Sequence, residues 1–145
     1  EFGMRAVTEN VAAIVGMAAA LKANTEMIDK TRDFLISLES LLINELNAKK
    51  IDYLRNGSQN HIPGNISLSF KGCDGEAILH RMDLKGISIS TGSACDSVNT
   101  QISHVISAIG VPEEYAQGTV RISLGKYNTE DDVLNIAQAL SEIVK

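Results

Sequence analysis

The chain has 145 residues with a net charge of −5, and 44% of its residues are hydrophobic. This length allows one domain with a hydrophobic core, and the acidic balance argues against a nucleic-acid partner, which requires a basic face. Two cysteines are too few for a disulfide framework, so we expect a reducing compartment, the cytoplasm.

The first predicted element is a helix over residues 11–21 that is apolar on all sides. Such a helix is buried on every side, and a domain of this size cannot easily cover it alone, so we expect a partner domain or subunit. The run is shorter than the roughly 20 residues that span a bilayer. The chain also opens without the basic segment of a signal peptide, so we expect no membrane association.

A second helix is predicted from a cap at Asn24–Thr25 to about Ala48, and Glu39 belongs to its polar face. Its inward stripe comprises Ile28, Thr31, Leu35, Leu38, Leu42 and Leu46. Arg55 opens a turn sequence. Further strands are predicted over residues 65–70, 87–90 and 119–125, and further helices over 74–85, 103–109 and from a capping box at 129–132 onward. We therefore predict an α+β fold: a small, partly antiparallel sheet of three or four strands with helices packed on one face.

The residue that stands out chemically is Cys95. It lies in a stretch of small and polar residues, Thr91 to Gln101, in which Val98 is the only sizeable apolar side chain. A loop of this composition buries little surface and is expected to be exposed. Cys95 is then either a nucleophilic thiolate or a small residue that happens to lie in a loop. The adjacent Asp96 disfavours the thiolate.

Arg121 projects from the polar face of the predicted strand 119–125. Its guanidinium group could hold a carboxylate through two parallel hydrogen bonds, or it could be a solvated surface arginine. Thr8 precedes the first helix and could either cap it or contact a phosphate. Cys73 lies at a strand-to-helix turn and is interpreted as structural. His61 and His104 stand alone in the sequence, so no metal site is predicted.

Four segments together resemble one family, the NifS-type cysteine desulfurases of the class V aminotransferase group, which use pyridoxal phosphate. The segments are residues 1–11, Pro63–Phe70, Ser90–Cys95, and Ser103–Val105 through Gly118–Gly125. The resemblance covers essentially the whole chain, and the cysteine segment and the arginine segment together make it specific.

The resemblance implies that the chain is the C-terminal portion of a longer, homodimeric enzyme. Residues 1–23 would link to a large domain that is absent from this chain, and residues 24–145 would form the small domain. Cys95 would take the sulfur of L-cysteine as a persulfide for an acceptor protein, and L-alanine would be released. Arg121 would hold the substrate carboxylate, and Thr8 the cofactor phosphate of the neighbouring subunit. Without the cofactor lysine, the portion alone is expected to lack pyridoxal phosphate and to be inactive.

The sequence departs from the family pattern at Val7, which stands where the family has glycine, and at Asp96, which replaces a small hydroxyl residue. Val98 and Ile102 depart as well. Two alternatives therefore stay open. One is another class V enzyme, such as a selenocysteine lyase or a transaminase-like protein. The other is a non-enzymatic domain whose Cys95 senses oxidants or docks a sulfur-accepting partner.

Overall fold

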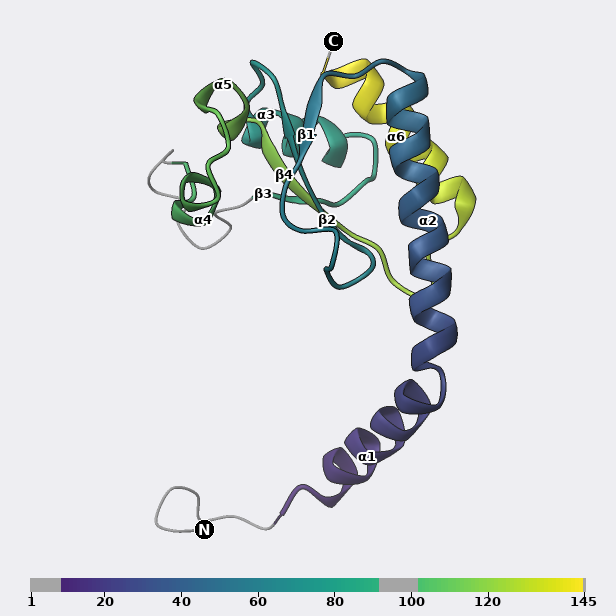
Figure 1. Ribbon diagram of the computed structural model, residues 1–145. Helices are drawn as coiled ribbons and strands as arrows, with labels where there is room; N and C mark the ends of the chain where they lie inside the picture. Colours follow the sequence, from purple (N-terminus) through teal and green to yellow (C-terminus); the bar gives the residue numbers. More distant parts are fainter. Residues whose placement is uncertain (1–8, 92–101, 145) are drawn as a thin grey trace. The chain divides into compact units, whose positions relative to one another are not determined.

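The structure, a computed structural model, describes residues 9–91 and 102–144 (Figure 1). The chain divides into two compact units, residues 1–32 and 33–145. The elements in chain order are α1 (Val11–Glu26), α2 (Ile28–Ala48), β1 (Tyr53–Arg55), β2 (Asn65–Phe70), α3 (Gly75–Asp83), β3 (Ser90–Thr91), α4 (His104–Ala108), α5 (Glu113–Ala116), β4 (Thr119–Ser123) and α6 (Glu130–Ile143).

In the first unit, α1 begins at Val11, as predicted, and continues to Glu26, beyond the predicted end at Leu21. The Asn10 side chain caps it by accepting a hydrogen bond from the Ala13 N–H at 3.1 Å. None of its residues is buried, and Val11, Val15 and Leu21 are 63%, 60% and 67% exposed. The apolar surface that the sequence predicts is therefore uncovered within this unit, and a covering partner stays a prediction.

The predicted cap at Asn24–Thr25 is wrong, because both residues lie in the last turns of α1. The Thr25 hydroxyl donates to the carbonyl of Leu21, four residues earlier, at 2.8 Å. A hydroxyl used in this way serves the interior of a helix and cannot cap the next one. The second helix accordingly begins at Ile28, while its predicted end at Ala48 is confirmed.

In the second unit, four strands form one antiparallel sheet in the order β1-β2-β4-β3. The two central strands are the clearest alternating segments of the sequence, and their apolar residues share one face. That face packs against α2, α3 and α6 in a single core cluster. The largest side chains that this core buries completely include Leu38, Leu42, Leu46, Ile66, Leu68, Phe70, Met82, Val120, Val133 and Leu140.

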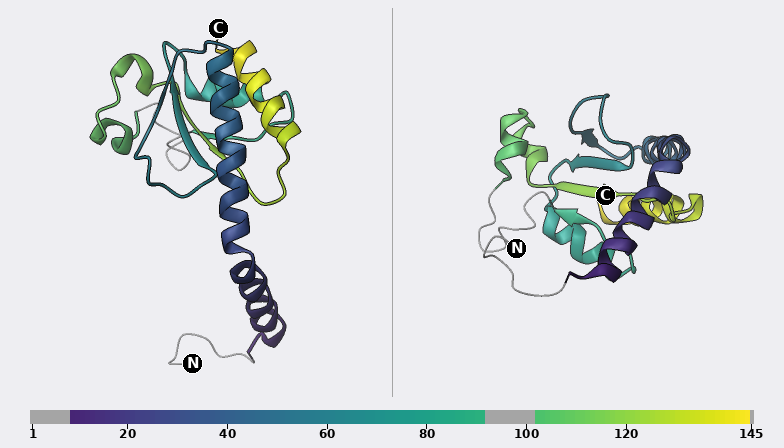
Figure 2. Two further views of the ribbon diagram at one scale, coloured as in Figure 1. Left: turned by 45° about the vertical axis from the view of Figure 1, so that its right-hand side comes forward. Right: turned by 90° about the horizontal axis from the view of Figure 1, so that it is seen from below.

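The predicted α+β fold, with helices on one face of the sheet, is confirmed. Figure 2 shows α3 and α6 on the same side of β4. The capping box of α6 is also as predicted, since the Thr129 N–H donates to Asp132 Oδ2 at 2.9 Å and Thr129 Oγ1 accepts from the Asp132 N–H at 3.2 Å.

Two short elements escape sequence-based prediction. The strand β1 has three residues, and α5 has four, so neither is long enough to show a period. Arg55 is the last residue of β1, and the turn begins after it. The strand predicted over 87–90 is shorter than expected, because among the described residues it comprises only Ser90–Thr91.

Candidate carboxylate-binding face of the sheet

The second face of the sheet, opposite the core, is polar. In the register of β2 and β4, Ser67 lies opposite Arg121, and Ser69 lies opposite Thr119. In the register of β3 and β4, Ser90 lies opposite Arg121 on the other side. Directly opposed residues in antiparallel strands point to the same face, so Arg121 is flanked by two serine hydroxyl groups.

Arg121 brings a positive charge to this face. It is exposed, and among the described residues its guanidinium group has neither a hydrogen bond nor an ion pair. None of the four strands contains an aspartate or a glutamate, so the sheet offers this cation no counter-charge. An unpaired guanidinium beside hydroxyl groups is suited to an external carboxylate.

A chain of hydrogen bonds runs along the same face. Asn56 Nδ2 lies 3.1 Å from Ser67 Oγ and 2.8 Å from Ser69 Oγ. Ser69 Oγ lies 2.7 Å from Thr119 Oγ1, which in turn lies 2.8 Å from the carbonyl oxygen of Ala116. Ser69 and Thr119 are buried, with 0% and 6% exposure, so these bonds are shielded from water. The network makes the polar face a rigid surface.

Close backbone contacts hold β4 against β2 at the start of this face. Gly118 N–H donates to Tyr115, and its carbonyl oxygen accepts from the Phe70 N–H at 3.1 Å. A Cβ atom at Gly118 would lie 2.2 Å from the carbonyl oxygen of Phe70, a distance that no side chain can occupy. The absence of a side chain at Gly118 therefore permits the approach of the strands that places Thr119 and Arg121.

Of the three residues predicted for the site, only Arg121 belongs to the described part of the chain. Cys95 and Thr8 lie outside the described residues, as do Val7, Asp96 and Val98. The covalent chain still limits the distance to the thiol. Cys95 follows Ser90, the cross-strand neighbour of Arg121, by five positions, and five residues span at most about 18 Å.

Cys73 has the properties of a structural cysteine. Its side chain is partly buried, packs against the core cluster, and lies with Sγ 3.4 Å from the carbonyl oxygen of Lys71. Burial raises the pKa of the thiol above its usual value, which lowers the thiolate fraction at neutral pH. Cys73 is therefore a poor nucleophile, in agreement with the interpretation from sequence.

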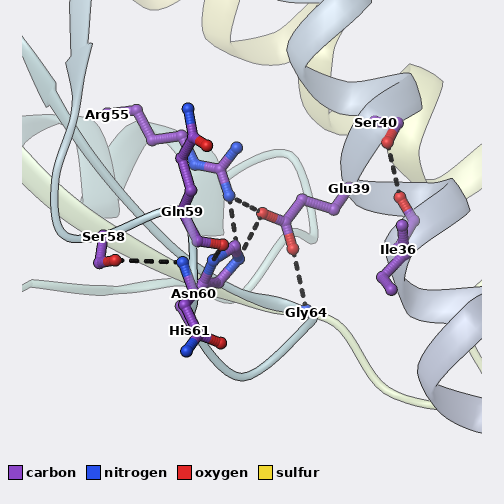
Figure 3. A network of polar contacts seen from close by, with 9 residues as sticks. All are labelled: Ile36, Glu39, Ser40, Arg55, Ser58, Gln59, Asn60, His61 and Gly64. Carbon is purple, nitrogen blue, oxygen red and sulfur yellow. Dashed lines mark hydrogen bonds and ion pairs between the residues drawn. The ribbon is translucent and has the colours of Figure 1, made fainter.

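A second polar cluster, which the sequence does not predict, surrounds Glu39 on the helical side (Figure 3). Glu39 is 5% exposed rather than part of a polar face, and it accepts hydrogen bonds from Arg55, from His61 Nε2 at 2.7 Å and from the Gly64 N–H at 3.1 Å. His61 Nδ1 lies 3.0 Å from the carbonyl of Gln59. His61 is thus engaged rather than isolated.

The position of Glu39 next to Leu38, within the apolar stripe, is the signal that could have indicated its burial. The cluster fastens the segment between β1 and β2 to α2, because each partner of Glu39 comes from that segment or its borders. A buried carboxylate is tolerated when several donors surround it, as here. We interpret the Glu39 cluster as structural support for β2.

The described residues contain no cluster of three or more histidine, cysteine, aspartate or glutamate side chains that could hold a metal ion. Within the same residues no single helix is long and apolar enough to cross a membrane. Only α1 and α2 taken together, with a bend between them, have the length and composition of a membrane span.

Comparison with known proteins identifies the relatives of the chain. The family described as Aminotransferase class-V matches residues 2–136. A cysteine desulfurase IscS of Dictyoglomus turgidum is 41% identical over 146 residues, covering 100% of this chain and 37% of the relative. A cysteine desulfurase IscS of Methanosarcina thermophila is 38% identical over 141 residues, covering 97% of this chain and 35% of the relative.

Solved structures agree in fold. A NifS-like protein matches with a TM-score of 0.79 at 31% identity, over 97% of this chain and 35% of that protein. A NifS-like protein from Rickettsia africae matches with a TM-score of 0.80 at 29% identity, over 96% of this chain and 36% of that protein. The chain therefore spans little more than a third of the length of the relatives that it matches.

Proposed function

Because the chain belongs to the class V aminotransferase family, we propose that it is the C-terminal part of a cysteine desulfurase in which Arg121 binds the carboxylate of L-cysteine and Cys95 receives the sulfur. The names of the curated relatives favour this activity over a selenocysteine lyase or a thiol sensor. The guanidinium group of Arg121 has no hydrogen bond or ion pair with any described residue, and the four strands contain no aspartate or glutamate; this is the structural observation that carries the proposal.

The roles of the residues follow from their chemistry. Two parallel N–H donors of Arg121 match the two oxygens of a carboxylate and fix the orientation of the amino acid. The Cys95 thiolate attacks the substrate sulfur: an S–S bond forms, the C–S bond breaks, and the carbon that keeps the electron pair takes up a proton to give L-alanine. Members of this family depend on pyridoxal phosphate, which supplies the electron sink when it is bound.

The cofactor contact assigned to this chain is Thr8, which lies outside the described residues. Within the proposal, the rest of the cofactor site and its lysine come from the remainder of the longer protein. The isolated 145-residue chain is then inactive. The uncovered apolar side chains of α1 support the division into a linking segment, residues 1–23, and a small domain, residues 24–145. The same surface supports a homodimer of the longer protein.

The proposal further holds that the persulfide on Cys95 is passed to an acceptor protein, for iron–sulfur clusters or another sulfur-transfer pathway, in the cytoplasm. Loop residues can carry a reactive group between two sites when they move, and the small and polar composition around Cys95 suits that role.

The decisive experiment measures alanine formation from L-cysteine by the full-length protein supplied with pyridoxal phosphate. We expect wild type to form alanine and to carry one added sulfur atom on Cys95, detected by mass spectrometry of the peptide. Cys95→Ala should lose both. Cys73→Ala is the matched control and should keep both, because its thiol is partly buried and poorly ionised. Alanine formation by Cys95→Ala at the wild-type rate would contradict the proposal.

A further inference from the structure

The contacts on the polar face of the sheet determine which group donates and which accepts each hydrogen bond. A carbonyl oxygen only accepts, so the hydroxyl proton of Thr119 goes to Ala116, 2.8 Å away. Thr119 Oγ1 must therefore accept from its neighbour Ser69, at 2.7 Å, which uses the proton of Ser69. Both hydroxyl protons in this buried pair are thus committed.

The direction of this pair determines the orientation of the Asn56 amide. Since Ser69 has already donated its proton, its oxygen can only accept from Asn56, so the amide nitrogen and not the amide oxygen faces it at 2.8 Å. The same Nδ2 lies 3.1 Å from Ser67 Oγ. An amide nitrogen carries two protons, and one goes to each serine. Asn56 is therefore the donor to both.

This arrangement leaves Ser67 with a hydroxyl proton that is not used by any described residue. Its oxygen accepts from Asn56, so its O–H is turned away from Asn56 and available to an external acceptor. Ser67 is half-buried and lies directly opposite Arg121 in the register of β2 and β4. Side chains in that relationship have Cβ atoms about 4.5–5.5 Å apart, so one small ligand can reach both.

We propose that Ser67 is a second substrate-binding residue, which donates a hydrogen bond to the carboxylate held by Arg121, and that Asn56 is the positioning residue that aims the Ser67 hydroxyl. The inference rests on the proposed function for the identity of the substrate. A carboxylate fits the site because Arg121 supplies one positive charge, and the only other cation on the strands, Arg55, is bound to Glu39 on the helical side. A hydroxyl beside the guanidinium group adds a third donor to one planar anion.

The test uses the full-length protein supplied with pyridoxal phosphate, and it measures both steady-state kinetics with L-cysteine and the Kd of the product L-alanine by calorimetry. Ser67→Ala should raise KM and the Kd about tenfold, because a hydrogen bond to a charged group is lost. The kcat should stay within about twofold, since the contact is made in the ground state and in the transition state alike. Ser67→Thr keeps the hydroxyl and should restore both values.

Three controls separate binding from folding. Ser123→Ala removes an exposed hydroxyl from the same face of β4, two positions after Arg121 and opposite Asn65 rather than Ser67, and should leave KM and Kd unchanged. Asn56→Asp replaces the donor to Ser67 by an acceptor, so the Ser67 hydroxyl proton turns toward residue 56 and away from the substrate. This variant should raise KM and Kd as Ser67→Ala does. Its thermal unfolding reports whether the fold is kept. L-alaninamide, which lacks the anionic carboxylate, should bind weakly and with a Kd that Ser67→Ala does not change.

The inference is overturned if Ser67→Ala leaves the Kd of L-alanine unchanged, or if wild type does not bind L-alanine. It is overturned equally if Ser67→Ala and Ser123→Ala raise the Kd alike. Failure of the proposed function gives a different result, namely no alanine from L-cysteine in wild type. In that case the Kd of L-alanine and its dependence on Ser67 still decide the inference.

Discussion

Arg121 on β4 and Ser67 on β2 lie directly opposite each other on the polar face of the sheet, while the neighbours of each along its strand are buried in the core. The period of two in a strand produces this separation, because successive side chains point to opposite faces. The strands thus use one face for the core and place Arg121 and Ser67 together on the other. A change on the polar face should therefore alter binding with little effect on folding.

The first prediction concerns the geometry of Arg121 itself. Arg121→Lys keeps the charge but replaces two parallel donors by a single ammonium group. We expect KM for L-cysteine to rise about tenfold or more, with a thermal unfolding midpoint close to that of wild type because Arg121 is exposed. Steady-state kinetics and calorimetric unfolding of the full-length protein check this. Wild-type KM in Arg121→Lys would show that the guanidinium geometry is not used.

A second prediction concerns the Glu39 cluster. Glu39→Gln removes the buried charge that Arg55 and His61 share, so we expect the free energy of unfolding to fall by about 1–2 kcal/mol. This is less than for a fully buried pair, because the Arg55 side chain is 38% exposed and can be solvated. Glu45→Gln on the same helix is the control, since the Glu45 side chain has no hydrogen bond or ion pair with any described residue. Equal stability of the two variants in urea unfolding would contradict the structural role.

A third prediction concerns the close approach at Gly118. Gly118→Ala would place a methyl group against the carbonyl oxygen of Phe70, and backbone cannot move aside cheaply, so we expect a loss of at least about 2 kcal/mol. Gly125→Ala, where the nearest atom is Asn128 Oδ1 at 3.9 Å, should be close to neutral. Denaturant unfolding of both variants measures the difference, and a neutral Gly118→Ala would show that the strands do not meet as described.

A fourth prediction uses the capping box of α6. The backbone N–H of Thr129 and the side chain of Asn128 lower the pKa of Asp132 below its usual value of 3.8. A group whose folded-state pKa is lowered stabilises the protein above its unfolded-state pKa, and this stabilisation is lost as pH falls through the folded-state pKa. Asp132→Ala should therefore lower Tm at about pH 7, and the difference from wild type should shrink below about pH 4.

Measurement of Tm for wild type and Asp132→Ala across that range provides the check. Asp131→Ala is the matched control, since Asp131 lies in the same first turn but outside the capping box. A difference between wild type and Asp132→Ala that stays constant with pH would contradict the assignment of the stabilisation to the carboxylate.

The local elements were predictable because their signals lie within a few neighbouring residues. The alternation of Ile66, Leu68 and Phe70 and the Thr129 capping box need only short stretches of sequence, and both are found in the structure. The Asn24–Thr25 cap failed for a related reason. A threonine can cap a helix or bond back within one, and the sequence does not distinguish the two uses.

By itself, the sequence determined the two central strands, most of the helices, the α+β class and the presence of Arg121 on a polar strand face, because periodicity and capping are local properties. Only the tertiary structure decided that Ser67 and Ser90 flank Arg121, that Asn56 aims Ser67, and that Glu39 is buried with Arg55 and His61. These relationships join residues far apart in the chain, and strand pairing and helix packing bring them together through the burial of a shared core.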